Sequence, residues 1–294
     1  MAEGPTGFRE GHVNGAGSIP ASVVTTPLGR PEALFRVGGA EQDGPGVRAQ
    51  MRTGPWMRGP DSGTCAGSLG VFLDDLLGNA LLAGRPEDYW PVSTELSIDL
   101  AAPVPADGSV LTGRGWPVSL EPGGGLSQGT VTGSSGALIA TATTRERFLP
   151  APRALLTGSG PDGVPPALDD AARQQSTMAL LGAVARRENG AVIMTVPGSG
   201  DFANPMGNTH GGILLCAAEM AGSLALHAEA SPLQTSSIRV VYTRSVPVTD
   251  TITYTAEVLH RGRTLGAAQV TACGASGKTC ALAMITAHDQ ALVR

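Results

Sequence analysis

Two stretches of the chain are apolar on almost every side of a helix. Ser68–Leu82 carries only two charged residues, Asp74 and Asp75, and Gly211–Leu226 carries only Glu219. A helix without a polar face belongs in the interior of a fold. A carboxylate buried within such a helix is costly unless it has a partner or a function. The pattern therefore predicts two central helices, each with an acid that needs an explanation.

After each of these helices the hydrophobic period changes to two. Alternation of apolar and polar residues, broken by Gly-rich turns, is typical of antiparallel strands joined by hairpins. One further strand precedes each helix, at Val47–Thr53 and at Ala191–Val196. The strands predicted after the helices are Thr94–Leu100, Ser109–Trp116, Leu126–Thr132 and Ala137–Thr144 in the first half, and Ser236–Thr243, Thr251–Leu259, Leu265–Ala272 and Cys280–Ala287 in the second.

The second half of the chain repeats the first. Cys65-Ala66-Gly67 lines up with His210-Gly211-Gly212 at an offset of 145 residues, and the same offset places Asp74 on Glu219. A repeat of that length, with one helix followed by four strands in each half, indicates a duplicated domain. We therefore predict an α+β fold with two tandem domains, 31–150 and 176–294. In each of them a curved antiparallel sheet wraps a central helix.

The segments outside these two domains lack periodicity. Residues 1–30 are expected to form an irregular tail, and 151–175 a linker rich in Pro and Gly. Within and after that linker, Ala167–Val184 has a helical composition. A short helix or turn is expected at Glu32–Phe35.

Composition and charge narrow the classes of function. A net charge of −5 and a pI near 5.5 argue against a general nucleic-acid binder. No uncharged apolar run reaches 18 residues, which argues against a membrane span. The first residues have no basic or apolar region of the secretory type, so we expect a cytoplasmic protein. The four cysteines, in no metal-binding spacing, are expected to be reduced core thiols, although a disulfide between two of them stays open; they are Cys65, Cys216, Cys273 and Cys280.

The loop before the second helix resembles a known family. Asn204, His210-Gly211-Gly212 and Glu219, nine residues after the histidine, are similar to the signature of the PaaI-like acyl-CoA thioesterases of the hotdog fold. The resemblance covers about 31–150 and 176–290. It implies a double hotdog, in which one chain takes the place of the family's dimer, and a thioester hydrolase that acts without a cofactor or a metal.

Thioester hydrolysis fits the residue types in this stretch. Gly211 and Gly212 lie where backbone N–H groups are free at a helix N-terminus, which is suited to a developing oxyanion. A carboxylate in an apolar helix has reason to be more basic than in water and could act as base or nucleophile. Asn204 could position water, and His210 could orient the loop or contact the thioester. Both residues could also have structural roles only, as a turn residue and as a helix cap.

The resemblance further implies that each site combines residues of both halves. The intact loop would then be completed by Asp74 and Ser93 of the first half, with Asp75 as an alternative acid. The second site would combine Glu219 and Ser237 with a degenerate loop. That loop has Gly59 for Asn204, Cys65 for His210 and Ala66 for Gly211. Our hypothesis is that the Asp74 site is active and the Glu219 site is impaired.

Substrate binding and competing functions can also be stated from the sequence. Coenzyme A is an anion, and Arg244, Arg261 and Arg263 are candidates for binding its phosphates. We expect an acyl-CoA or acyl-carrier thioester as substrate and allow for homo-oligomers. Two alternatives stay open. One is a non-catalytic acyl-CoA or acyl-carrier binding protein. The other is a MaoC-type enoyl-CoA hydratase, although the closely spaced Asp and His of that family are not found.

Overall fold

The computed structural model describes residues 30–60, 63–151, 176–227 and 233–289. Each half consists of two strands, a central helix and four further strands, with one short helix before them. The elements of the first half are α1 (Arg30–Leu34), β1 (Glu41–Asp43), β2 (Gly46–Arg52), α2 (Gly70–Leu81), β3 (Tyr89–Leu100), β4 (Val110–Glu121), β5 (Gly124–Thr132) and β6 (Leu138–Pro150). Those of the second half are α3 (Thr177–Leu180), β7 (Val184–Glu188), β8 (Ala191–Val196), α4 (Gly211–Leu226), β9 (Gln234–Tyr242), β10 (Ile252–Arg261), β11 (Leu265–Cys273) and β12 (Thr279–His288).

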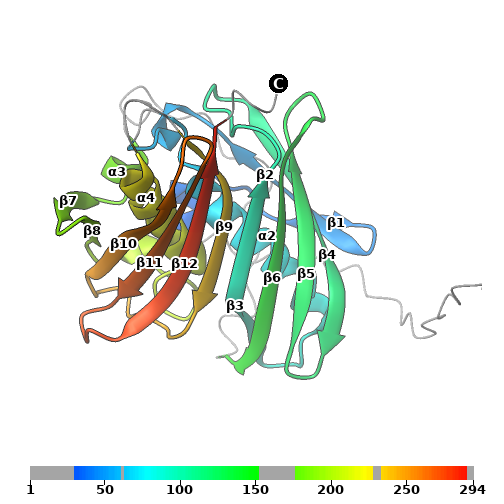
Figure 1. The fold of residues 1–294 in the computed structure, drawn as a ribbon. Helices are drawn as coiled ribbons and strands as arrows, with labels where there is room; N and C mark the ends of the chain where they lie inside the picture. The colour runs from blue at the N-terminus through cyan, green and yellow to red at the C-terminus, as the bar shows by residue number, and fades with distance from the viewer. Residues whose placement is uncertain (1–29, 61–62, 152–175, 228–232, 290–294) are drawn as a thin grey trace, which may run out of the picture.

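The strands form one twelve-stranded antiparallel sheet that runs through both halves. Its order is β1-β2-β4-β5-β6-β3-β9-β12-β11-β10-β8-β7. Strands β3 and β9 join the halves, with Cα partners from Glu95–Val241 to Asp99–Ser237. Figure 1 shows α2 and α4 on one face of this sheet, each behind the strands of its own half. The prediction of two tandem domains, each with a sheet wrapped around one helix, is confirmed.

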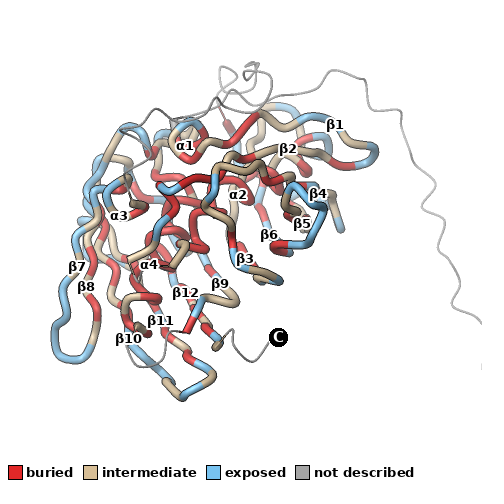
Figure 2. Tube along the Cα trace, turned by 90° about the horizontal axis from the view of Figure 1, so that it is seen from above, coloured by how far each residue is buried: buried red, intermediate tan, exposed pale blue. Residues whose placement is uncertain are grey.

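The core lies between the two helices and the sheet. Viewed from above, buried positions gather on α2, α4 and the strand positions that face them (Figure 2). The helices contact each other directly, because glycines let their backbones approach. A Cβ atom on Gly212 would lie 2.4 Å from Cα of Val71, and one on Gly70 would lie 2.6 Å from the carbonyl oxygen of Gly212. The N-terminal parts of the two helices therefore pack backbone to backbone.

The alternation along β6 explains which of its side chains face α2. Exposed and buried residues alternate over most of the strand, so that every second side chain points inward. The inward set is small and apolar at first, with Ala140 and Ala142, and then contains Thr144, Glu146 and Phe148. Glu146 is therefore a carboxyl group at a core position, directed at the helix.

The duplication extends to the loops that precede the helices. Isolated bridges join Arg58 to Thr64 in the first half and Ala203 to Thr209 in the second, at the offset of 145 found in the sequence. The N–H groups of Gly59 and Asn204 each donate to the carbonyl oxygen four residues later, at 2.8 Å in both loops. The two loops therefore have the same backbone frame and differ in their side chains.

Some sequence predictions need correction. The helical composition of Ala167–Val184 gives a single helical turn, α3, and Val184 already begins strand β7; residues 167–175 of that segment lie outside the described residues. Strand β7 is an edge strand with mostly exposed residues, so its apolar positions have no period to detect. The predicted tail and most of the predicted linker also lie outside the described residues.

Two further expectations can be compared with the structure. All four cysteines are free thiols. Within the described residues one helical segment, Ala66–Gly84, is long and apolar enough by composition to span a membrane. That segment contains α2, and 72% of its apolar window is buried inside the protein. Its apolar character is accounted for by its place in the core.

Candidate active site

The loop before α4 is held in place by its own side chains. Oδ1 of Asn204 accepts the N–H groups of Met206 and Asn208, at 3.0 Å each. His210 is the N-cap of α4, and its Nδ1 lies 3.0 Å from the N–H of Gly212. Asn204 therefore shapes the loop, as a turn residue would, while also lining the pocket described below.

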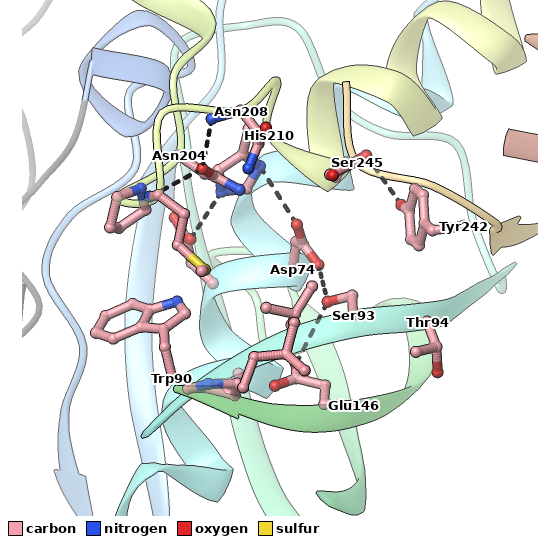
Figure 3. A pocket seen from close by; sticks show the side chains of 18 of the residues that line it. Asp74, Trp90, Ser93, Thr94, Glu146, Asn204, Asn208, His210, Tyr242 and Ser245 are labelled. Atoms are coloured by element: carbon pink, nitrogen blue, oxygen red, sulfur yellow. Dashed lines mark hydrogen bonds and ion pairs between the residues drawn. The ribbon is translucent and has the colours of Figure 1, made fainter. Parts of the chain in front are cut away.

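An acid of the first half completes this helix N-terminus. The N–H of Gly212 donates to Oδ2 of Asp74 at 3.0 Å, and the hydroxyl of Ser93 on β3 donates to Oδ1 at 2.5 Å. Figure 3 shows Asp74 between His210 and Ser93. The structure thus brings together the set that the sequence assigned to one crossed site, with Asp74 and Ser93 from one half and His210 and Gly212 from the other.

Gly211 lies against the same carboxylate. A Cβ atom at this position would lie 2.7 Å from Oδ2 of Asp74, so only glycine leaves the acid in place. The hydroxyl of Tyr242 donates to the carbonyl oxygen of Gly211 at 2.9 Å and fixes that peptide. The N–H of Gly211 donates no hydrogen bond to any of the described residues. This N–H is therefore available at the positive end of the α4 dipole.

Asp75, the alternative acid, also points into the site. Its Oδ1 lies 3.1 Å from Nε2 of His210, while Oδ2 of Asp74 lies 3.3 Å from Nδ1. Neighbours on a helix are about 100° apart, but the imidazole lies between them and is reached from both sides. The two acids therefore share one histidine.

Burial and charge shift the titration of this cluster. Burial raises the pKa of Asp74, against the opposing effects of His210, Ser93 and the N–H of Gly212. Burial lowers the pKa of His210, but Asp75, Asp74 and Glu32 outweigh it and raise the pKa to about 10. Burial and Asp75 raise the pKa of Glu32 to about 8, with His210 opposing. At neutral pH His210 is therefore charged, with a ring N–H facing each aspartate, and the N–H of Gly212 then bonds to Asp74 alone, because a protonated Nδ1 cannot accept it.

Glu146 is a part of the site that the sequence analysis missed. Its Oε1 lies 3.5 Å from the Ser93 hydroxyl, which in turn bonds to Asp74 (Figure 3). Burial and the charge of Asp74 raise the pKa of Glu146 well above that of an ordinary glutamate. Gly78 on α2 makes room for it, because a Cβ atom there would lie 3.2 Å from Oε1. An acid at an inward-facing strand position was the signal available in the sequence.

The Glu146 carboxyl group should make the stability of the protein depend on pH. Because its folded-state pKa is raised, the folded protein keeps a proton that the unfolded chain loses. This contribution is complete below the ordinary glutamate pKa and is lost as the pH rises through the folded-state value. We expect Glu146→Gln, which mimics the neutral acid, to lose less free energy of unfolding than the wild type between pH 5 and pH 9. Urea unfolding at several pH values measures this, and equal losses in both proteins would contradict it.

A pocket of about 330 Å³ opens beside Asp74 and Gly211. Its apolar wall includes Leu82, Trp90 and Leu149, and Arg244 lies at its edge. Its polar lining includes Glu32, Asp75, Ser93, Glu146, Asn204, His210 and Tyr242. In the described part of the chain, Glu32, Asp75 and His210 are also the group whose side chains could hold a metal ion.

Arg261 and Arg263 do not line this pocket. Arg261 ends β10 opposite Gly266, while the α4 N-terminus lies near the other end of that strand. Their contact with the phosphates of a substrate stays a prediction, without support from the pocket lining. An arginine that belongs to the same half of the sequence as the His210 loop need not lie at the same end of the sheet as that loop.

The counterpart of this site, around Glu219, is buried and hydrogen-bonded. Glu219 is 2% exposed, and it accepts hydrogen bonds from the hydroxyl of Thr235 at 2.6 Å and from the thiol of Cys65 at 3.0 Å. Cys65 thus occupies the position that His210 has in the intact loop. Ser237 was predicted to contact Glu219, but Thr235 makes this contact in the structure. The hydroxyl of Ser237 bonds to Thr286 instead, at 2.6 Å. A register shift between β12 and β9, at Thr286, lies at this point.

Comparisons with known proteins agree with this fold. Residues 206–281 match the model of the thioesterase superfamily. A comparison with curated proteins found no match. A Lactobacillus plantarum structure, provisionally assigned as an oleoyl thioesterase, is 12% identical with a TM-score of 0.56, over 82% of this chain and 95% of that one. An acyl-ACP thioesterase from Bacteroides thetaiotaomicron is 11% identical with a TM-score of 0.52, over 87% of this chain and 99% of that one.

A single-domain structure is similar in sequence over a shorter stretch. The Escherichia coli PaaI protein is 25% identical over 38% of this chain and 86% of its own, with a TM-score of 0.36. The two longer likenesses extend over both halves and show the fold, and the superfamily match falls on the half with the intact His-Gly-Gly loop. Residues 206–281 therefore match the thioesterase superfamily, and the chain as a whole has the double-hotdog fold of these structures.

Proposed function

We propose that the protein hydrolyses acyl thioesters at one active site, built from Asp74 and Ser93 of the first half and the Asn204–Gly212 loop of the second. One observation carries this proposal. The carboxylate of Asp74 is bound at the N-terminus of α4, beside an unoccupied backbone N–H and an open pocket. Acid, oxyanion donor and substrate space therefore meet at one point, as acyl transfer requires.

The chemistry follows from this arrangement. The thioester carbonyl oxygen accepts a hydrogen bond from the N–H of Gly211, and the α4 dipole stabilises the negative charge that develops on it. Asp74 removes a proton from a water molecule as the water oxygen attacks the carbonyl carbon. The carbon–sulfur bond then breaks, and the thiolate takes up the proton that Asp74 received. A direct attack by Asp74, through an acyl anhydride that water then cleaves, is the alternative route.

The neighbouring side chains tune the acid. Burial makes Asp74 more basic than a carboxylate in water, while Ser93 and Gly212 keep its two oxygens in place. A neutral Glu146 can donate to the Ser93 oxygen, so that the Ser93 hydrogen points to Asp74. In this role Glu146 is a positioning residue, which acts on Asp74 through Ser93.

The substrate is an acyl thioester of coenzyme A or of an acyl carrier protein. The apolar wall of the pocket suits an acyl group, since burial of methylene groups is favourable there. The Lactobacillus and Bacteroides structures are described as an oleoyl and an acyl-ACP thioesterase, which supports the same class of substrate. Such thioesters occur in the cytoplasm, where we propose that the protein acts, either as a single chain or as a homo-oligomer.

Arg244 is our candidate for contact with the phosphates of coenzyme A. Its guanidinium is exposed at the pocket edge and donates to the carbonyl oxygen of Thr279 at 2.8 Å. We expect Arg244→Ala to raise KM for acyl-CoA about tenfold, with kcat unchanged, because one charge-assisted contact to phosphate is lost. Acyl-pantetheine, which lacks the nucleotide, should show no change. The matched control is Arg263→Ala, and a larger effect of that variant would contradict the placement.

A panel of acyl-CoA and acyl-carrier substrates tests the proposed function. Release of free thiol, followed with a thiol reagent, is expected for at least one acyl class. Binding without thiol release would identify a non-catalytic acyl-CoA or acyl-carrier binding protein instead. Addition of water to an enoyl-CoA, without thiol release, would identify a hydratase.

A further inference from the structure

Three potential metal ligands from distant parts of the chain meet beside the catalytic acid. They are Glu32 on α1, Asp75 on α2 and the N-cap residue His210, and one ligand atom of each lies within 4.8 Å of the other two. Nε2 of His210 is 3.1 Å from Oδ1 of Asp75. No sequence spacing could have indicated this group, because its members are far apart in the chain.

Two oxygens of this group lack a hydrogen-bond donor from any other side chain or backbone group. Glu32 is 4% exposed, and among the described residues its Oε2 and Oδ2 of Asp75 can bond only by sharing a proton between the two carboxyl groups. A buried carboxylate oxygen without a donor is costly, and two such acids side by side repel each other. His210 is the only member of the group that can carry a positive charge. The group therefore needs a further positive species, which can be a proton or a cation.

We propose that Glu32, Asp75 and His210 bind a first-row divalent cation of the Zn²⁺ type. One imidazole and two carboxylates are common ligands of such ions, with ligand distances of about 2.0–2.2 Å. Ligand atoms of one ion then lie roughly 3 to 4.4 Å apart, which is close to the separations in this group. All three residues line the pocket, so a fourth position would face its interior and hold water.

Cation binding would also act on Asp74 through the histidine. A cation at Nε2 replaces the proton there and leaves the imidazole with one proton, on Nδ1. Nδ1 lies 3.3 Å from Oδ2 of Asp74 and would donate to it. A carboxylate that accepts from a metal-bound histidine is a common outer-shell arrangement. Asp74 would then orient the metal ligand while remaining bonded to Gly212 and Ser93.

Zinc binding to the purified full-length protein tests this site. After removal of metal with a chelator, titration calorimetry with ZnCl₂ should show one ion per chain. Proton release should accompany binding, because the imidazole nitrogen and the carboxylates must be free of protons to coordinate the ion. Glu32→Gln and Asp75→Asn should each weaken binding about 100-fold, since even outer-shell changes cost 10- to 100-fold. Co²⁺ should give a ligand-field spectrum that both variants lose.

Glu219→Gln is the matched control, because it also neutralises a buried carboxylate but outside this group. It should bind Zn²⁺ as the wild type does. The proposal is overturned if the wild type binds no Zn²⁺, which would leave a shared proton between Glu32 and Asp75. It is also overturned if all variants bind equally, which would indicate an adventitious ion only. Circular dichroism verifies that each variant is folded. These readouts do not require thioester turnover, so they are independent of the proposed function.

Discussion

Asp74→Asn is expected to lower kcat for acyl-CoA hydrolysis about 10³-fold, while Glu219→Gln keeps the wild-type rate. Asparagine has the shape of the aspartate and keeps an oxygen for Ser93 or Gly212, but it cannot accept a proton from water. Loss of a general base typically costs 10²- to 10⁴-fold. Glu219 is buried and bonded to Thr235 and Cys65, so we expect its charge to have no role in turnover. Thiol release from the best substrate of the panel measures both variants.

The two variants form a matched pair, because each neutralises one acid at the same position of the repeat. Equal melting temperatures would show that any loss of rate is not a loss of fold. If Glu219→Gln is inactive and Asp74→Asn is active, the assignment of the site to the Asp74 side is wrong. If both variants lose half of the rate, both sites turn over substrate and the proposal of a single site fails.

Gly212→Ala is expected to lower the free energy of unfolding by about 3 kcal/mol, at the upper end of the usual cost of overpacking. The added Cβ would lie 2.4 Å from both Cα and N of Val71 and 2.5 Å from the carbonyl carbon of Gly70. These are backbone atoms of α2, which cannot turn aside as a side chain can. The helices would have to separate, and the N–H of Gly212 would move away from Asp74. Urea unfolding measures the loss of stability.

Gly123→Ala serves as the control for that measurement. A Cβ at Gly123 meets nothing within 4 Å, and the residue lies in the turn between β4 and β5. We expect its stability to remain within about 0.5 kcal/mol of the wild type, as for other surface substitutions. A Gly212→Ala protein as stable as the wild type would show that the two helices can separate without cost. Thiol release by that variant would then show whether the crossing also positions the acid.

The sequence contained enough information to predict most of the fold. Two all-apolar helices, the change to a period of two and the offset of 145 residues predicted the duplicated hotdog, and the observed sheet agrees. The errors lie where these signals are weak. Strand β7 lies at an exposed edge, where packing imposes no alternation. Ser237 was predicted for the Glu219 site, whereas Thr235 reaches Glu219 in the folded protein.

The candidate site could be predicted from the sequence only in part. His210-Gly211-Gly212 and the two acids at one repeat position are local features, which could be predicted from the sequence. Three contacts are visible only in the folded protein: Asp75 joins Asp74 at the same histidine, Cys65 binds Glu219, and Glu146 lies beside Ser93. The physical reason is that helix and strand periods fix which residues share a face. Contacts between helices and strands far apart in the chain depend on how closely they pack, and here glycines at the α2–α4 crossing set that distance.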